Sequence, residues 1–134
     1  MKNSRAFKDQ AYGAMARLVK ALANPIRLEM IDLLRNGEKS VEEIARATGT
    51  SVANASQHLQ ILKKLNLVHS RKEGTFAYYS LANPEVGALW QLLLKLSYQH
   101  VPELHELVQN KRKRLPHFDG PPDSDRFYLL DVRP

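Results

Sequence analysis

The stretch TSVANASQHLQILKKLNL runs from Thr50 to Leu67, and SVEEIARATG, from Ser40 to Gly49, lies directly before it. Plotted at about 100° per residue, the longer stretch separates into two arcs of a helix. The apolar arc holds Val52, Ala55, Leu59 and Leu62, and the opposite arc holds Ala53, Ser56, Gln57, Gln60 and Lys64. The pattern predicts a helix that packs through one face and leaves the other face free for recognition.

The segment before this helix carries start and stop signals. Ser40 and Glu43 have the spacing of a capping box, in which the hydroxyl and the carboxylate each accept a hydrogen bond from a backbone amide. Gly49 suits the left-handed residue that closes a helix, and Ser51 suits the residue that caps the next one. Only a short turn remains between the two helices, which is the spacing of a helix-turn-helix.

The free face of the second helix matches the chemistry of DNA base edges. Asn54 and Gln57 can make paired hydrogen bonds to a base. Ser56 can donate or accept, and Ala53 can contact a thymine methyl group. The other residues that we expect at DNA in this region are Ser51, Gln60 and Lys64. For this helix alone an ordinary solvated face explains the same residues, and it is the rest of the chain that favours recognition.

The composition favours an anionic partner and excludes several classes of protein. The 134 residues suffice for one compact domain, or for one domain and a tail, and carry a net charge of +6 with a pI near 9.7. No cysteine is present, so disulfides, thiolate metal sites and cysteine nucleophiles are excluded for this chain. Because the sequence also lacks a phosphate-binding loop and a convergent set of acid and base residues, we do not expect an enzyme.

No segment has the pattern of a secretion signal or a membrane span. The opening MKNSRAFKDQ is charged and lacks the apolar centre of a signal peptide. The most apolar run, from Val86 to Leu94, is interrupted by Gln91 and is too short to cross a bilayer. We therefore expect a cytoplasmic protein without a membrane partner.

Two further helices are expected before the helix-turn-helix. Apolar residues recur at helical spacing from Arg5 to Ala23, which predicts a first amphipathic helix. Asn24-Pro25 ends that pattern and can start another helix, because Asn caps well and Pro suits the first helical position. Asn36-Gly37 should stop the second helix.

After the recognition helix the period changes from about 3.6 to 2, which predicts a β-hairpin within LVHSRKEGTFAYYSL, residues 67–81. Gly74 supplies the positive φ that its turn needs. A basic hairpin directly after a recognition helix is the wing of a winged helix. Arg71, Lys72 and Thr75 are placed to meet DNA phosphates, although a solvated turn explains them equally well.

Asn83-Pro84 opens a last helix that is apolar on more than one side, including Val86, Leu92 and Leu94. A chain of this length offers only one core, so a second subunit is the natural partner for the remaining apolar side. Pro102 is expected to kink this helix or to restart it.

These elements together resemble the arsenic-repressor (ArsR/SmtB) family of winged-helix transcription repressors, over about residues 18–100. The motifs that carry the resemblance are ALANPIRLEMIDLL, S-x-x-x-x-SQHL from Ser51, and EG-x-x-x-YYSL from Glu73 to Leu81. The resemblance implies a mainly α fold with a small β-hairpin wing, a homodimer formed by the first and last helices, and recognition helices in successive major grooves. The interface residues expected on those helices are Phe7, Met15, Leu18, Leu89, Trp90, Leu93 and Leu96.

The resemblance also implies an inducer that weakens DNA binding, but the chain departs from the metal sites of the family. Where members carry a Cys-x-Cys pair, this chain has Ser40-Val41-Glu42-Glu43. On the last helix the corresponding positions are Asn83, Glu85, Leu96 and Gln99, of which only Glu85 could ligate. His100 and His105 lie about 140° apart on a helix and do not converge. We therefore expect no metal and no cofactor, and a small-molecule inducer is possible.

The sequence predicts a boundary near residue 115. Residues 1–115 form the expected DNA-binding and dimerisation domain, and residues 116–134 the expected linker and tail. The ending RFYLLDVRP is similar to the first strand of rhodanese-type sulfurtransferase domains, so the tail could begin such a domain, truncated here. An ordinary tail that docks on the dimer or stays disordered is the other interpretation.

We thus expect a sequence-specific DNA-binding regulator, in particular a repressor, that acts as a homodimer on an inverted-repeat operator in double-stranded DNA. Two alternatives stay open. The winged helix could be a protein-interaction module, although Ser56-Gln57 and Arg71-Lys72 argue against that use. The chain could also be the regulatory half of a longer sulfurtransferase fusion.

Overall fold

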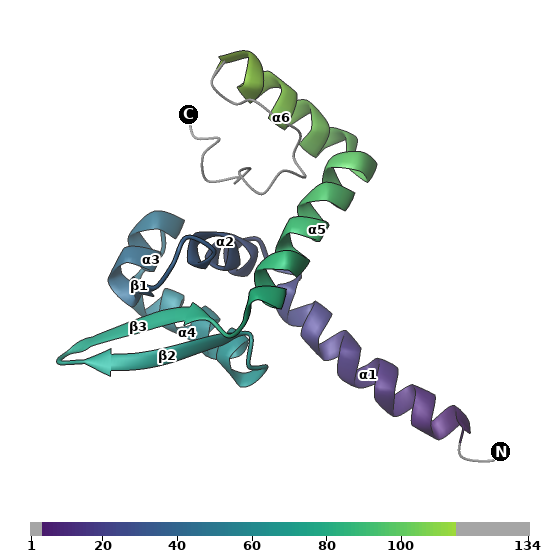
Figure 1. The fold of residues 1–134 in the computed structure, drawn as a ribbon, viewed down its shortest axis with the longest axis horizontal. Helices are drawn as coiled ribbons and strands as arrows, with labels where there is room; N and C mark the ends of the chain where they lie inside the picture. The colour runs from purple at the N-terminus through teal and green to yellow at the C-terminus, as the bar shows by residue number, and fades with distance from the viewer. Residues whose placement is uncertain (1–3, 115–134) are drawn as a thin grey trace.

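A computed structural model describes residues 4–114, with side chains described as far as Asn110 (Figure 1). The predicted linker and tail, residues 116–134, lie outside the described residues. The elements in chain order are α1 Ser4–Leu22, α2 Pro25–Leu34, β1 Lys39–Ser40, α3 Val41–Thr48, α4 Val52–Lys64, β2 Val68–Glu73, β3 Phe76–Leu81, α5 Pro84–His100 and α6 Pro102–Arg114. The predicted fold class is confirmed: mostly helices, with a small antiparallel sheet.

Polar caps fix the starts of α3 and α4, and a left-handed glycine lies at the turn between the two helices. Ser40 Oγ accepts from the Glu43 amide, and a Glu43 carboxylate oxygen accepts from the Ser40 amide, each at 3.1 Å. Gly49 ends α3 in the left-handed region at φ 68°, and Ser51 Oγ then accepts from the Asn54 amide at 3.1 Å. The capping box, the glycine stop and the serine cap predicted from the sequence are all confirmed.

The core lies between α2, α3 and α4 and continues onto α5 and the sheet. Its fully buried side chains include Met30, Ile31, Ile44, Leu59 and Leu62. Ala55 is also buried, as the apolar arc of α4 predicted. The prediction that Val52 packs with this arc was wrong, because Val52 is 46% exposed. It is the first residue of α4, where a helical side chain leans back beyond the end of the core.

The hairpin extends into a three-stranded sheet of order β1-β3-β2, antiparallel throughout. The predicted turn is confirmed, with Gly74 at φ 61° and Glu73 paired to Phe76. Strand β1 was not predicted, since two residues carry no period. Lys39 and Ser40 pair with Tyr79 and Tyr78 on β3, so the residue that caps α3 also belongs to the sheet.

Helix α5 begins at the predicted Asn83-Pro84, and the side chain of Asn83 accepts from the Val86 amide. It ends at His100, and Val101 is extended before α6 starts at Pro102, so the predicted restart is confirmed. Of the helices in the described part of the chain, none is long and apolar enough to span a membrane.

Helix α1 extends away from the rest of the molecule (Figure 1). Only its last turn is buried, through Ala21 and Leu22. Four large apolar side chains along α1 are exposed: Phe7, Tyr12, Met15 and Val19. A helix that exposes this much apolar surface has a face left to cover.

The first prediction concerns the cap of α3. Ser40→Ala removes the hydroxyl that accepts from the Glu43 amide, so the free energy of unfolding should fall by about 1 kcal/mol. Urea unfolding followed by circular dichroism measures this. An unchanged midpoint at an unchanged slope would contradict the assigned cap.

The same cap gives an expected pH dependence. The hydrogen bond from the Ser40 amide lowers the pKa of Glu43 below its usual 4.5, so its contribution is present above that value and is lost as the pH falls through the lowered pKa. Glu43→Gln should therefore lose less stability on acidification than the parent. Glu42→Gln is the matched control, because Glu42 is an exposed neighbour outside the capping box.

Candidate nucleic-acid interface

The N-terminal half of α4 presents an exposed face with no acidic side chain. Ala53, Asn54 and Gln57 are exposed and Ser56 is half-buried. Ala55 and Leu59, which are one helical turn apart, are buried. The helix VANASQHLQILKK contains no Asp or Glu at any position. Ser51 is exposed but already serves as the cap. The structure therefore brings the predicted recognition residues together on one accessible surface.

Gln60 lies nearer the sheet than the other predicted residues. Its side-chain amide donates to the Tyr79 hydroxyl on β3 at 3.1 Å, so it links α4 to the wing. Burial raises the pKa of Tyr79, which keeps this phenol neutral at physiological pH. Lys64, the last residue of α4, is exposed. Gln60 can still reach solvent, but its contact with Tyr79 could not be read from the sequence.

The side chains of the wing differ in whether they contact other side chains of the protein. Lys72 and Thr75 are exposed at the tip of the hairpin. Arg71 is held by carboxylates instead: its guanidinium donates to Glu38 and to Glu73 and lies over the ring of Tyr78. These contacts raise the pKa of Arg71 above its usual value. The expected phosphate contact by Arg71 would therefore have to compete with two carboxylates.

The rear of α4 is fixed to α2 through Arg27. The Arg27 guanidinium donates to the backbone carbonyl of Ala21 and lies 3.0 Å from Nδ1 of His58. His58 is half-buried, and its ring nitrogen is engaged by Arg27 of α2. The contact between Arg27 and His58 joins residues 31 apart in the sequence, so no local pattern predicts it.

A polar cluster joins α2 to α5. Arg35 at the end of α2 donates to buried Asp32 at 3.0 Å and to the side-chain oxygen of Gln91. Its guanidinium lies 4.4 Å from the centre of the Trp90 ring, and the indole N–H donates to the Leu28 carbonyl. Through this cluster α2 and α5 form one packed unit.

This cluster corrects the expected role of Trp90. The side chain is only 5% exposed within a single chain, so it belongs to the protomer core and not to a surface open to a partner. Leu18, Leu89 and Leu93 are half-buried. Among the predicted interface residues, the well-exposed ones are Phe7, Met15 and Leu96. Tyr12, Val19 and Leu92 were not predicted at the interface but are also exposed.

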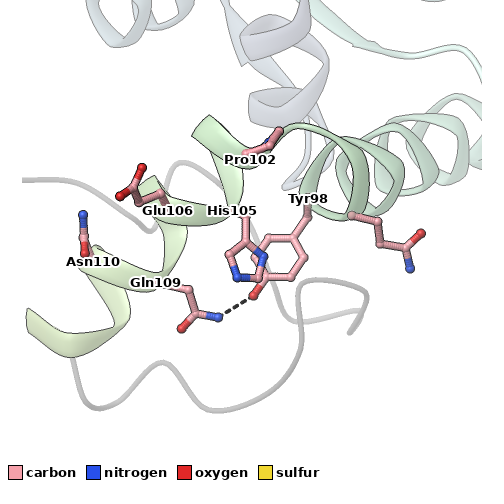
Figure 2. A pocket seen from close by; sticks show the side chains of 7 residues that line it. Tyr98, Pro102, His105, Glu106, Gln109 and Asn110 are labelled. Atoms are coloured by element: carbon pink, nitrogen blue, oxygen red, sulfur yellow. Dashed lines mark hydrogen bonds between the residues drawn. The ribbon is translucent and has the colours of Figure 1, made fainter.

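The elbow between α5 and α6 carries an open hollow of about 580 Å³ (Figure 2). The rings of Tyr98 and His105 lie 4.5 Å apart, and Gln109 donates to the Tyr98 hydroxyl. Gln99, one of the four positions that the resemblance aligned with a metal site, is among its lining residues and is not a metal ligand by type. Over the described residues no group of three or more His, Cys, Asp or Glu side chains is close enough to hold a metal ion.

Comparison with known proteins decides the family. A family model described as bacterial regulatory protein, arsR family, matches residues 24–70, which contain the capped turn and α4. Transcriptional activator HlyU of Vibrio cholerae is 39% identical over 82 residues, which are 61% of this chain and 76% of HlyU. The chain belongs to the ArsR family.

Other relatives place this ArsR-family chain among winged helix-turn-helix regulators. The transcriptional regulator Rv0324 of Mycobacterium tuberculosis is 44% identical over 67% of this chain, and the match spans only 40% of that protein. A solution structure from Mycobacterium bovis, described as a homodimeric winged helix-turn-helix DNA-binding domain of a possible ArsR-family regulator, aligns with a TM-score of 0.63 at 42% identity. That alignment covers 75% of this chain and 90% of the other. The names of these relatives describe regulators of transcription.

Proposed function

We propose that this ArsR-family regulator is a repressor that binds an inverted-repeat operator in duplex DNA as a homodimer. The observation that carries the proposal is the exposed, acid-free polar face at the start of α4. Its residues lie on a helix whose position is fixed by caps, by Arg27 and by Gln60, so the face is held before DNA arrives. A preorganised face loses less conformational entropy on binding.

Direct readout is assigned to the first two turns of α4. Asn54 and Gln57 can each pair with an adenine edge in the major groove, and Ala53 can meet a thymine methyl group. Ser51 and Ser56 lie beside them, and Gln60 and Lys64 follow along the helix. Lys72 and Thr75 at the wing tip meet phosphates, which adds affinity without sequence preference. The net charge of +6 supports this anionic partner.

The proposed dimer is formed by α1 and α5. The exposed Phe7, Met15 and Val19 are spaced at four or eight residues along α1, so they form one stripe. Leu92 and Leu96 form a similar pair on α5. Covering these side chains with a second copy removes apolar surface from water and places two α4 helices for successive major grooves.

Repression follows if the operator overlaps a promoter, because a bound dimer then excludes the polymerase. A reporter fused to a promoter that carries the bound sequence tests whether the protein represses. Reporter expression should rise when the gene that encodes the protein is deleted. A fall in expression would make the protein an activator, which is how HlyU is named.

We further propose that the inducer is not a metal ion bound by this chain. Soft metals need thiolates, and the sequence has no cysteine. Zinc needs three or four converging ligands, whereas Asn83 is occupied as the cap of α5 and Leu96 cannot ligate. A small molecule at the dimer seam is the inducer that the remaining chemistry supports.

Base readout by α4 can be tested at Gln57. Gln57→Ala removes a paired hydrogen bond to a base, so it should cost about 1–3 kcal/mol of binding free energy and relax the preference at one base pair of each half-site. Fluorescence anisotropy with the selected operator and single-base variants of it measures both effects. Gln99→Ala on α5 is the matched control and should bind like the parent. If Gln57→Ala also does so, α4 is not the reader.

The dimer generates the third prediction. Met15→Glu places a charge within the apolar stripe of α1, so a monomer should replace the dimer in sedimentation velocity, because a buried unpaired charge costs several kcal/mol. Arg17→Glu is the control, since it lies about 200° round the helix from Met15. A dimer that persists in Met15→Glu would remove α1 from the interface.

The fourth prediction concerns the signal. Titration with zinc at neutral pH should show no tight binding and no release of operator DNA, because the ligand set is missing. Calorimetry and a parallel gel-shift assay measure the two. Sub-micromolar binding that also releases DNA would show that other ligands converge in the assembled dimer.

A further inference from the structure

The two faces of the sheet do different work at the wing. Alternate residues of a strand point to opposite faces. Tyr79 is buried and bonded to Gln60 of α4, so it marks the inner face, which packs against the recognition helix. Lys72 pairs with Ala77, two residues from Tyr79, and therefore shares the inner face. Arg71 pairs with Tyr78 and lies on the outer face, away from α4.

All three guanidinium nitrogens of Arg71 donate to carboxylates on that outer face. Its Nε donates to one carboxylate oxygen of Glu38 at 2.9 Å, and a terminal nitrogen donates to the other at 2.6 Å. The second terminal nitrogen donates to Glu73 at 2.9 Å, and the guanidinium carbon lies 4.7 Å from the centre of the Tyr78 ring. Fork-to-fork contact with Glu38 fixes the direction of the guanidinium as well as its position.

This contact spans the whole width of the sheet. Arg71 is on β2 at one edge, Tyr78 is on the central β3, and Glu38 directly precedes β1 at the other edge. Strand β1 leads into α3, the first helix of the helix-turn-helix. The pair therefore ties the hairpin to the segment that positions α3, 33 residues away in sequence. The hydrogen bonds from Arg71 lower the pKa of Glu38, so its carboxylate stays charged at neutral pH.

We propose that Arg71 is a positioning residue for DNA binding: its pair with Glu38 holds the wing at the angle at which Lys72 and Thr75 reach phosphate, and Arg71 itself contacts no phosphate. The proposal rests on the proposed function and replaces the direct contact expected from the sequence. With two carboxylates beside it, the Arg71 cluster carries a net negative charge, which disfavours a phosphate at the same place.

The test is a double-mutant cycle on the full chain. Glu38→Ala, Arg71→Ala and the double variant are titrated against a duplex that the parent protein has selected from random sequence, over a range of salt concentrations. Glu103→Ala, which removes an exposed carboxylate on α6, controls for the change in net charge. Lys72→Ala controls for the loss of a proposed phosphate contact. It should reduce the magnitude of the slope of log K against log salt concentration by about 1. Circular dichroism verifies that each variant is folded.

The expected result is that Glu38→Ala weakens binding by roughly three- to ten-fold although it removes a negative charge. Arg71→Ala should weaken binding equally, the double variant should be no weaker than either single one, and the salt slope should stay at the parent value in all three. Tighter or unchanged binding by Glu38→Ala, additive losses, or a salt slope that falls by about 1 in Arg71→Ala would each overturn the proposal. If the parent selects no duplex, the proposed function itself fails, which is a different outcome from failure of the Arg71 assignment alone.

Discussion

The caps of α3 and α4, together with the left-handed Gly49 between the two helices, set how α3 and α4 meet. A helix start leaves backbone amides without partners inside the helix. Here the side chains of Ser40, Glu43 and Ser51 accept hydrogen bonds from the amides of Glu43, Ser40 and Asn54, respectively. Gly49 reverses the chain at a positive φ that other residues rarely adopt. The direction of α4 relative to α3 therefore follows from residues within a single short segment. Ser40 also pairs with Tyr78, so the residue that caps the start of α3 joins α3 to the sheet.

The position of α4 is then carried to the rest of the molecule by a few polar contacts. Gln60 links it to the wing, and Arg27 links it to α2. Arg35 in turn connects α2 to α5 through Asp32 and the ring of Trp90. Since α5 also carries the exposed Leu92 and Leu96, these contacts connect that apolar patch with the exposed face of α4. In the proposed function, a ligand at a dimer seam on α5 would act on α4 by this route.

Local signals explain how much of this could be predicted. Caps at Asn24, Ser40, Ser51 and Asn83, and the glycine at the hairpin turn, depend on neighbours within a few residues, so the sequence locates them well. The candidate recognition face followed from helical period for the same reason. What failed was non-local: the side on which Trp90 is covered, the two-residue strand β1, and the pairing of Arg71 with Glu38. Those depend on how elements distant in the sequence meet, and an apolar helix looks the same whether its own chain or a partner covers it.

The absence of cysteine makes the central claim directly measurable, because one introduced cysteine is the only site for a thiol-reactive DNA-cleaving iron chelate. If α4 enters the major groove, a chelate at Ala53→Cys cuts the selected duplex at two centres about one helical turn apart, one in each half-site. A chelate at Thr75→Cys should cut at the outer flanks of those centres. If the Ala53→Cys conjugate binds the duplex without cutting it, while a chelate at Gln99→Cys on α5 does cut, then DNA lies against another surface and the assignment of α4 as the reader is wrong.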